Sequence, residues 1–156
     1  MRKTIILAAL TAIITPGCSP GSGQEAAKKE ITILLEQERR AHFNRDVDLF
    51  LSSFGDSMIL VNKGIVKTPT REENKKRFGN YFGSVTFIKW DDVAPPVIRF
   101  SDDASLAYAI VQKQVILSYP DSLGKAFYDT SGYAWVSIYR KQDGKWKGEV
   151  NISTNK

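Results

Sequence analysis

The first half of the chain repeats apolar residues at intervals of three and four, which is the spacing of one helical face. This pattern predicts a helix over residues 24–44, followed by a short helix that Asp46 can cap. A third helix is expected after Thr70, because Thr70 and Glu73 form a capping box, and it should end near Phe82. The face of the first helix that carries the apolar residues consists of Ile31, Leu34, Leu35, Glu38, Ala41 and His42.

From residue 85 onward the apolar pattern changes to a period of two, which is typical of strands. Pro95-Pro96 should interrupt the sheet, because proline has no N–H to donate to a neighbouring strand. Helices followed by long antiparallel strands predict an α+β domain, with one curved antiparallel sheet wrapped over three N-terminal helices. Strands are predicted over residues 57–61, 65–67, 85–93, 97–101, 106–119, 126–140 and 145–153.

The strand over residues 106–119 carries polar side chains on both faces. Tyr108, Gln112 and Gln114 share one face, whereas Lys113 lies on the other face among alanines and valines. A period of two fixes the alternation but not which face points inward. Tyr108, Gln112 and Gln114 are therefore ligand-binding candidates if their face lines a pocket, and otherwise they face solvent or a dimer partner.

The N-terminus has the features of an export signal. Two basic residues, Arg2 and Lys3, precede an uncharged apolar run over residues 4–14. Eleven residues in a helix reach about half of a hydrocarbon core of ~30 Å, so this run is too short to span a membrane. Its length fits the apolar segment of a secretory signal.

Cys18 follows Gly17 directly after this segment, and the arrangement resembles the lipobox of bacterial lipoproteins. The resemblance implies that the thiol is acylated and that the chain is cut before Cys18. Residues 1–17 would then be a signal peptide, and residues 18–23 a lipidated cysteine with a flexible tether of Ser, Pro and Gly. The alternative is a plain secretory signal that is cut elsewhere and leaves a free thiol.

Acylation would attach the protein to a membrane of the bacterial cell envelope. Ser19 stands where resemblance to known sorting rules associates an Asp with retention in the inner membrane, so the outer membrane is favoured over the inner one. A Cys18→Ser variant should leave the membrane fraction, and a variant that still sediments with membranes would contradict the anchor.

The composition of 42% hydrophobic and 25% charged residues in 156 describes one ordinary globular domain, expected over residues 24–154. A single Cys excludes an internal disulfide, and a single His excludes a metal site of several histidines. Removing residues 1–17 takes away two of the 22 basic residues and none of the 17 acidic ones, so the net charge falls from +5 to +3. This charge does not indicate a nucleic-acid partner, and no Gly-rich phosphate loop or other cofactor motif is present.

Two segments, residues 41–64 and 135–153, resemble the nuclear transport factor 2-like superfamily in its SnoaL-like branch. The first matches a run of helices, an Asp, a short strand and a Gly turn, and the second matches the closing hairpin with Arg140, Asp143-Gly144, Trp146 and Ser153. The resemblance implies a cone-shaped fold with a half-open apolar pocket. Members of the superfamily include isomerases, dehydratases, cyclases and plain binding modules.

Two departures from the family weaken an acid–base interpretation. Ketosteroid isomerase-like members use a pocket carboxylate near the end of the first strand, where this chain has Asn62. An amide cannot accept a proton at neutral pH. Many members also place a His two residues before the final Ser, where this chain has Asn151. Both asparagines remain candidates for ligand binding.

The remaining chemistry depends on a few ionisable and aromatic residues. His42 is a candidate base, with Asp46 about one helical turn later, although a histidine packed on the helix flank would look the same in sequence. Glu149 is a strand carboxylate whose pKa would rise if it were buried alone. Trp90 and Trp135 could form an aromatic wall for a ligand or belong to the core.

These observations predict an envelope lipoprotein with a cone-shaped domain that binds a small apolar ligand or forms a homodimer. The alternative is an isomerase or hydro-lyase that acts through His42, Asp46 or Glu149 on a small apolar substrate in the pocket. No metal, cofactor or nucleic acid is predicted, and the sequence contains no complete catalytic constellation.

Overall fold

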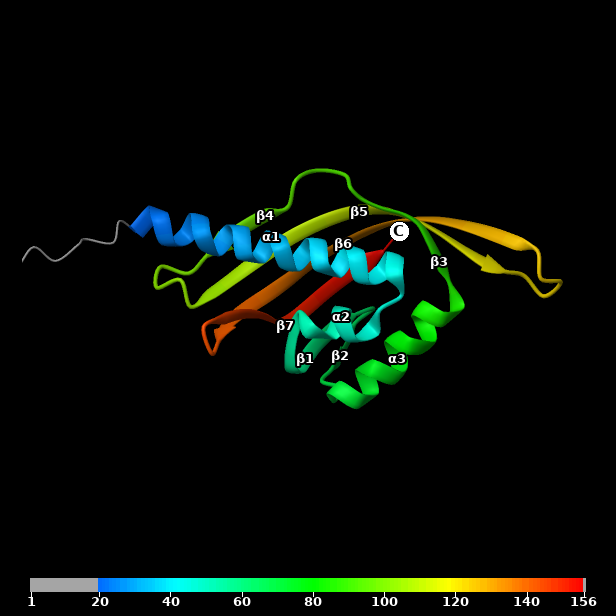
Figure 1. Cartoon of the computed structure of the whole chain (residues 1–156), viewed down its shortest axis with the longest axis horizontal. Coiled ribbons are helices and arrows are strands. Elements are labelled where there is room, and N and C mark those ends of the chain that lie inside the picture. The colour runs from blue at the N-terminus through cyan, green and yellow to red at the C-terminus, as the bar shows by residue number, and fades with distance from the viewer. Residues whose placement is uncertain (1–19, 156) are drawn as a thin grey trace, which may run out of the picture.

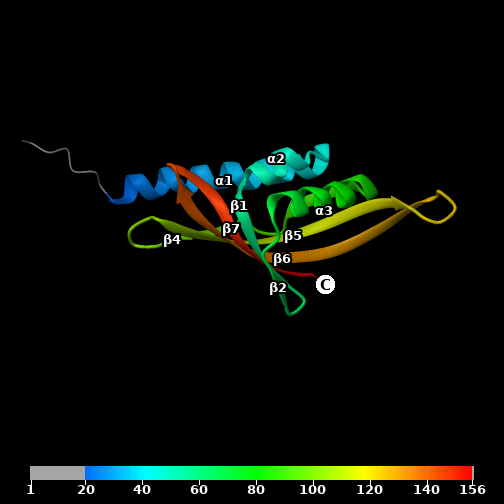
Figure 2. The same ribbon diagram turned by 90° about the horizontal axis from the view of Figure 1, so that it is seen from below.

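The computed structural model describes residues 20–155, and the expected signal and Cys18 lie outside this range. The helices are α1 (Pro20–Asn44), α2 (Val47–Ser52) and α3 (Arg71–Ser84). Figure 1 shows α1 lying across the sheet, and Figure 2 shows that all three helices cover one face of it. The strands are β1 (Phe54–Asn62), β2 (Ile65–Lys67), β3 (Thr86–Asp92), β4 (Val97–Phe100), β5 (Leu106–Pro120), β6 (Ala126–Gln142) and β7 (Lys145–Asn155).

The capping residues act as their positions in the sequence predict. At the start of α2, Leu49 N donates a hydrogen bond to Asp46 Oδ1 at 2.8 Å. At the start of α3, Thr70 and Glu73 each accept a bond from the other's backbone N–H. None of the helices within residues 20–155 is long and apolar enough to cross a membrane.

Helix α1 starts earlier than the sequence pattern predicts. It begins at Pro20 rather than at Gln24, so residues 20–23 are helical, although the prediction placed them in a flexible tether. Proline suits the first turn of a helix, because its missing N–H would have no partner there in any case.

The seven strands form one sheet in the order β2-β1-β7-β6-β5-β3, with β4 also paired to β5. The predicted α+β class with three helices over a curved sheet is confirmed. The sheet is mixed rather than wholly antiparallel, because β1 and β7 run in parallel. These two strands come from opposite ends of the domain, so no tight hairpin turn imposes antiparallel pairing on them.

The strand register is interrupted at several points in the sheet. One lies between Phe54 and Ile59 where β1 meets β7, and another lies between Phe87 and Lys89 where β3 meets β5. Such bulges place extra residues on one strand and increase its local twist. Gly148 accommodates the first of them, because a Cβ at this position would lie 2.5 Å from Cδ1 of the Phe54 ring.

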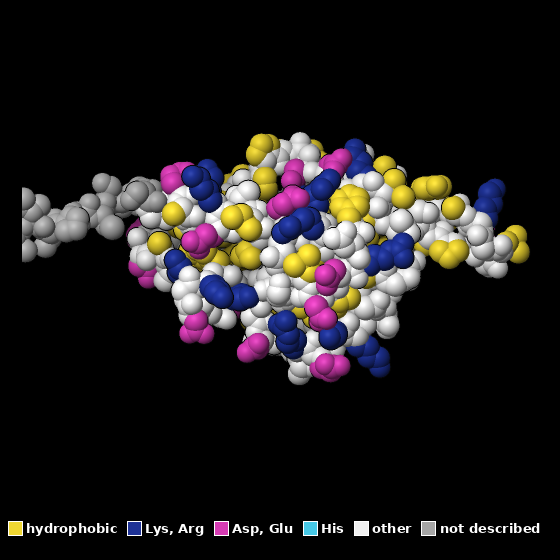
Figure 3. Space-filling model, in the orientation of Figure 1, with side chains coloured by type: hydrophobic (Ala, Val, Ile, Leu, Met, Phe, Trp, Pro, Cys, Tyr) yellow, Lys and Arg dark blue, Asp and Glu magenta, His cyan; other side chains and the backbone are white. Residues whose placement is uncertain are grey.

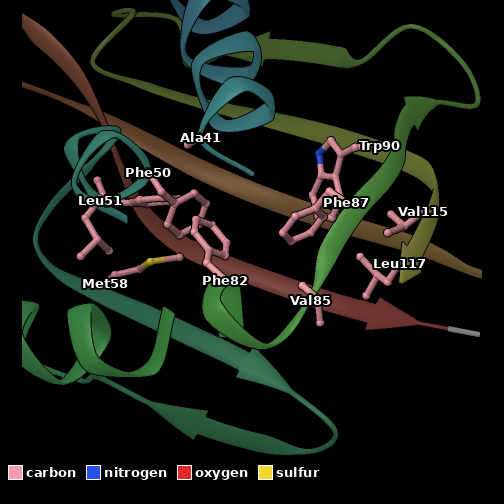
Figure 4. Packing of buried hydrophobic residues seen from close by; sticks show 11 residues of the cluster. Ala41, Phe50, Leu51, Met58, Phe82, Val85, Phe87, Trp90, Val115 and Leu117 are labelled. Atoms are coloured by element: carbon pink, nitrogen blue, oxygen red, sulfur yellow. The ribbon is translucent and has the colours of Figure 1, made fainter. Parts of the chain in front are cut away.

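The core lies between the helices and the covered face of the sheet. Figure 4 shows its aromatic part, where Phe50, Phe82, Phe87 and Trp90 gather between strand β3 and the helices. A second cluster lies along α1 and includes the fully buried Ile31. The face of β5 that points inward carries Ala107, Ala109, Val111, Lys113 and Val115.

Candidate functional site

A cavity of about 530 Å³ lies between the helices and the sheet, and this volume would hold a small organic molecule. Its inner part is formed by buried residues of α1, α2, β1 and β3, and its outer part by exposed residues of the β1–β2 hairpin and α3. Side chains of β6 and β7 complete the wall. Most of the inner lining is apolar or aromatic and includes Phe50, Phe54, Met58, Phe78, Trp90 and Trp135.

Among residues 20–155, Glu38 is the only acidic residue that lines this cavity. It is 7% exposed, and its Oε1 atom is buried without a hydrogen-bond partner among the described residues. Burial raises the pKa of its carboxyl from 4.5 to about 8, and the nearby positive charge of Lys113 opposes this shift only in part. The carboxyl is therefore mostly protonated at neutral pH and can donate a hydrogen bond.

His42 lies one helical turn after Glu38 and also lines the cavity. Its Nδ1 atom is 2.6 Å from the backbone oxygen of Glu38, so Nδ1 carries the proton and donates to that oxygen. The imidazole stacks on the Trp90 ring at a centroid distance of 4.0 Å. Burial lowers its pKa to about 4, so the ring is neutral at pH 7 and its Nε2 atom is unprotonated.

Lys113 projects from β5 into the same buried region. Its side chain is 5% exposed, and its Nζ atom lies 2.6 Å from Oδ1 of the partly exposed Asp92. The positive charge of Lys113 acts on both Glu38 and His42 and lowers both pKa values. The ion pair with Asp92 supplies the partner that a buried ammonium group requires.

Further polar groups of α3, β1, β6 and β7 line the cavity. The Nε1 atom of Trp135 is buried and has no hydrogen-bond partner among the described residues. Asn62 Nδ2 donates to Ser153 Oγ at 2.8 Å, so this asparagine is held by a neighbouring strand. Burial raises the pKa of the Tyr81 and Tyr133 hydroxyls, and both stay protonated at neutral pH.

The structure brings five of the residues predicted from the sequence to the cavity. They are His42, Asn62, Trp90, Trp135 and Asn151. Asn62 and Asn151 come from the adjacent strands β1 and β7, so residues far apart in the chain meet there.

The other predicted site residues lie elsewhere. Tyr108, Gln112 and Gln114 are exposed on the outer face of the sheet, because Lys113 and its neighbours of the same parity take the inner face. Asp46 is exposed and caps α2, so it does not pair with His42. Glu149 accepts a bond from Arg140 Nε at 2.9 Å and is not buried alone.

Glu38 is a site residue that was not predicted from the sequence, where it stands among the apolar positions of the first helix. Its position could have identified it, because a lone carboxylate among apolar positions that face the core is buried without an evident partner. Its pKa and its access to the cavity depend on β3, β5 and β6, which the helix pattern does not reveal.

Three comparisons place the chain among known proteins. No protein-family model matches it, and no curated protein matches it in sequence. Among solved structures, a candidate dehydratase of the NTF2-like family from Streptomyces avermitilis superimposes with a TM-score of 0.68 and 10% identity, over 83% of this chain and 96% of that one. A ketosteroid isomerase-like protein from Erwinia carotovora atroseptica gives a TM-score of 0.65 and 15% identity, over 81% and 94%.

A protein of unknown function from Mycobacterium tuberculosis gives a TM-score of 0.69 at 13% identity and covers 90% of this chain and 78% of that one. Identities this low show the fold and not the activity. The architecture and these similarities agree, and the chain has the nuclear transport factor 2-like fold.

Proposed function

We propose that this domain binds a small, mostly apolar ligand in the cavity, with a polar group of the ligand placed against Glu38. The observation that carries the proposal is the buried Glu38 carboxyl, whose pKa is raised by burial, in a cavity whose buried part is mostly apolar and aromatic. Such a carboxyl lacks a hydrogen-bond partner from the described residues, and a ligand hydroxyl or carbonyl would supply one. The apolar wall would supply the rest of the binding energy.

The proposal is tested with 2-naphthol, a neutral aromatic probe with one hydroxyl. At a concentration about one hundred times its Kd, a ligand stabilises the folded state by about 2.7 kcal/mol, which is a shift of several degrees in Tm. We expect this shift for the unaltered chain. A Leu60→Trp variant should lose the shift, because Leu60 lines the cavity and a larger side chain would fill it.

The matched control is Ile59→Trp, because Ile59 neighbours Leu60 on β1 and is not among the cavity-lining residues. Ile59 pairs with Val150 on β7, Val150 pairs with Ile138 on β6, and Ile138 pairs with the exposed Tyr108 on β5. Ile59 therefore lies on the same outer face of the sheet as Tyr108. A probe that stabilises both variants equally, or that does not stabilise the unaltered chain, would contradict binding in the cavity.

A second candidate function is an isomerase or hydro-lyase in the same cavity, and Glu38 favours it. A catalytic acid or base works best when its pKa lies near the working pH, and the pKa of about 8 at Glu38 meets this condition. His42 does not, because a ring with a pKa of about 4 is a weak base at neutral pH. Glu38 thus replaces His42 as the residue to carry a proton in this candidate.

Hydrogen–deuterium exchange at the carbon next to the carbonyl of 2-tetralone, followed by NMR in D₂O, tests this candidate. Ionised Glu38 would take a proton from that carbon and return a deuteron, so exchange should exceed the buffer rate and should rise with pH around pH 8. A Glu38→Gln variant should fall to the buffer rate. Exchange that persists in Glu38→Gln would remove Glu38 from the mechanism.

The outer face of the sheet suits a homodimer, which we propose as the assembly of the domain. Register places Val97, Ile110, Val136 and Ile152 in one row across four strands. Three of them, Val97, Ile110 and Ile152, are 42% to 45% exposed, so they form a row of apolar side chains that a second copy of the chain could cover. We expect a dimer in sedimentation velocity and a monomer for Ile110→Lys. A strictly monomeric unaltered chain would contradict this assembly.

A further inference from the structure

The outer part of the cavity is lined by three cationic side chains. Lys63 lies in the turn of the β1–β2 hairpin, Lys67 is the last residue of β2, and Arg77 lies on α3. All three are exposed, whereas Glu38 and His42 at the inner part are buried. The cavity therefore has a cationic mouth, by which we mean Lys63, Lys67 and Arg77, and a mostly uncharged interior.

The cationic mouth forms no ion pair within the described part of the chain. No carboxylate there lies within 4.0 Å of Lys63, Lys67 or Arg77, although other basic residues are paired. Lys75, on the same helix as Arg77, lies 2.9 Å from Asp48, for example. Figure 3 shows basic and acidic side chains interspersed over the helical face, so three cations around one opening are a local concentration of charge.

Two carboxylates, Glu38 and Asp129, lie in or close to the cavity. Glu38 is the only acid in the described range that lines the cavity, and it is mostly protonated at neutral pH. Asp129 on β6 acts on Tyr81 and Tyr133, but it does not line the cavity, and its Oδ2 accepts a bond from Ser131. An anion at the mouth would meet three positive charges and no fixed negative charge among the lining residues.

Arg77 is held in a position that suits an anionic ligand. Its guanidinium lies over the Phe78 ring at 4.2 Å, and Nη2 donates to Oδ1 of the buried Asn74 at 3.1 Å. These contacts fix the plane of the group and use only part of its five-donor fork. A fixed guanidinium binds carboxylates well, because it can donate two parallel hydrogen bonds.

We propose that the cavity selects an apolar carboxylate, with the hydrophobic body of the ligand inside and its carboxylate at Lys63, Lys67 and Arg77. This inference rests on the proposed ligand binding and names the class of ligand. The carboxylate stays at the exposed mouth, so it keeps part of its hydration while it gains the cationic partners. The aromatic and aliphatic wall then contacts only the uncharged body.

Isothermal calorimetry on the full chain with 2-naphthoate and 2-naphthamide tests the proposal, because the two probes differ mainly in charge. We expect 2-naphthoate to bind about tenfold more tightly, which is typical of a hydrogen-bonded charged group. Its advantage should shrink as salt is added, because the mouth is exposed and its charges are screened. Arg77→Gln should remove most of this advantage, because it should weaken binding of 2-naphthoate far more than binding of 2-naphthamide.

Two further variants separate the loss of a positive charge at the mouth from a disturbance of the α3 packing. Lys67→Gln, on the exposed hairpin, should reduce the advantage without touching the α3 packing, and Lys75→Gln is the control on α3. Equal affinity for both probes would overturn the carboxylate proposal and leave cavity binding intact. A preference that persists in both Arg77→Gln and Lys67→Gln would also overturn it. If neither probe nor 2-naphthol binds, the proposed function fails as well.

Discussion

A Glu38→Gln substitution should stabilise the domain at pH 9 and leave its stability nearly unchanged at pH 4. The carboxyl has a pKa of about 8 in the folded chain and 4.5 as its ordinary value. The unfolded chain therefore loses this proton from about pH 4.5 upward, whereas the folded chain keeps it until about pH 8. Folding becomes less favourable across that window, by roughly 5 kcal/mol at its upper end if each pH unit contributes about 1.4 kcal/mol.

Glutamine has nearly the shape of protonated glutamate and cannot ionise, so it should remove this loss. Urea unfolding of both proteins at several pH values from 4 to 9 measures the effect as a difference that grows with pH. Glu36→Gln is the matched control, because Glu36 lies on the exposed side of α1. A difference that is the same at all pH values would show that Glu38 is not protonated in the folded chain.

A His42→Phe substitution is expected to reduce the loss of folding stability that occurs as the pH falls from about 6.5 to about 4. Burial lowers the pKa of His42 from 6.5 to about 4, so the unfolded chain takes up a proton that the folded chain excludes. The stability from this residue is complete above about pH 6.5 and falls as the pH drops to about 4, by roughly 3 kcal/mol. Phenylalanine keeps an aromatic ring beside Trp90 and cannot be protonated.

Because the chain contains one histidine, no other imidazole can produce an acid transition between pH 6.5 and pH 4. The same urea titrations, compared over this window, give the contribution of His42 directly. The variant will be less stable at neutral pH, because it loses the bond from Nδ1 to the backbone oxygen of Glu38. If its pH profile in acid matches that of the unaltered chain, the imidazole is not buried in its neutral form.

These two residues reduce stability at opposite ends of the pH range, and an apolar pair in their place would avoid both losses. Residues that lower the stability of the folded state in this way are found mainly at functional sites. Both residues line the cavity, which supports a binding or proton-transfer role over a purely structural one. The two pKa shifts also give the residues different roles: Glu38 can hold and release a proton near neutral pH, whereas His42 stays neutral there.

Local signals in the sequence were sufficient for most of the fold. Asp46 and Thr70 mark helix starts because their side chains bond to N–H groups a few residues away. Strand alternation is equally local. The parallel pairing of β1 with β7 could not be predicted in this way, because it joins segments about 90 residues apart, such as Asn62 and Ser153.

The orientation of β5 shows why the site was only partly predictable. Both faces of this strand mix polar and apolar residues, and the inward face contains a lysine. Lys113 is buried because Asp92 on β3 pairs with it, and that partner is not evident from the strand's own pattern. Tyr108, Gln112 and Gln114 were therefore candidates that the structure moves to the outer surface.

The stacking of His42 on Trp90 has a consequence for spectroscopy. The rings of Phe50 and Phe87 lie nearly perpendicular to the same imidazole at centroid distances of 5.2 and 5.0 Å. Circulating electrons in these rings shift the resonances of nearby protons, and the shift changes steeply with the position of each ring. The single histidine should thus give one displaced set of imidazole signals, which would report any molecule that enters the cavity without an added label.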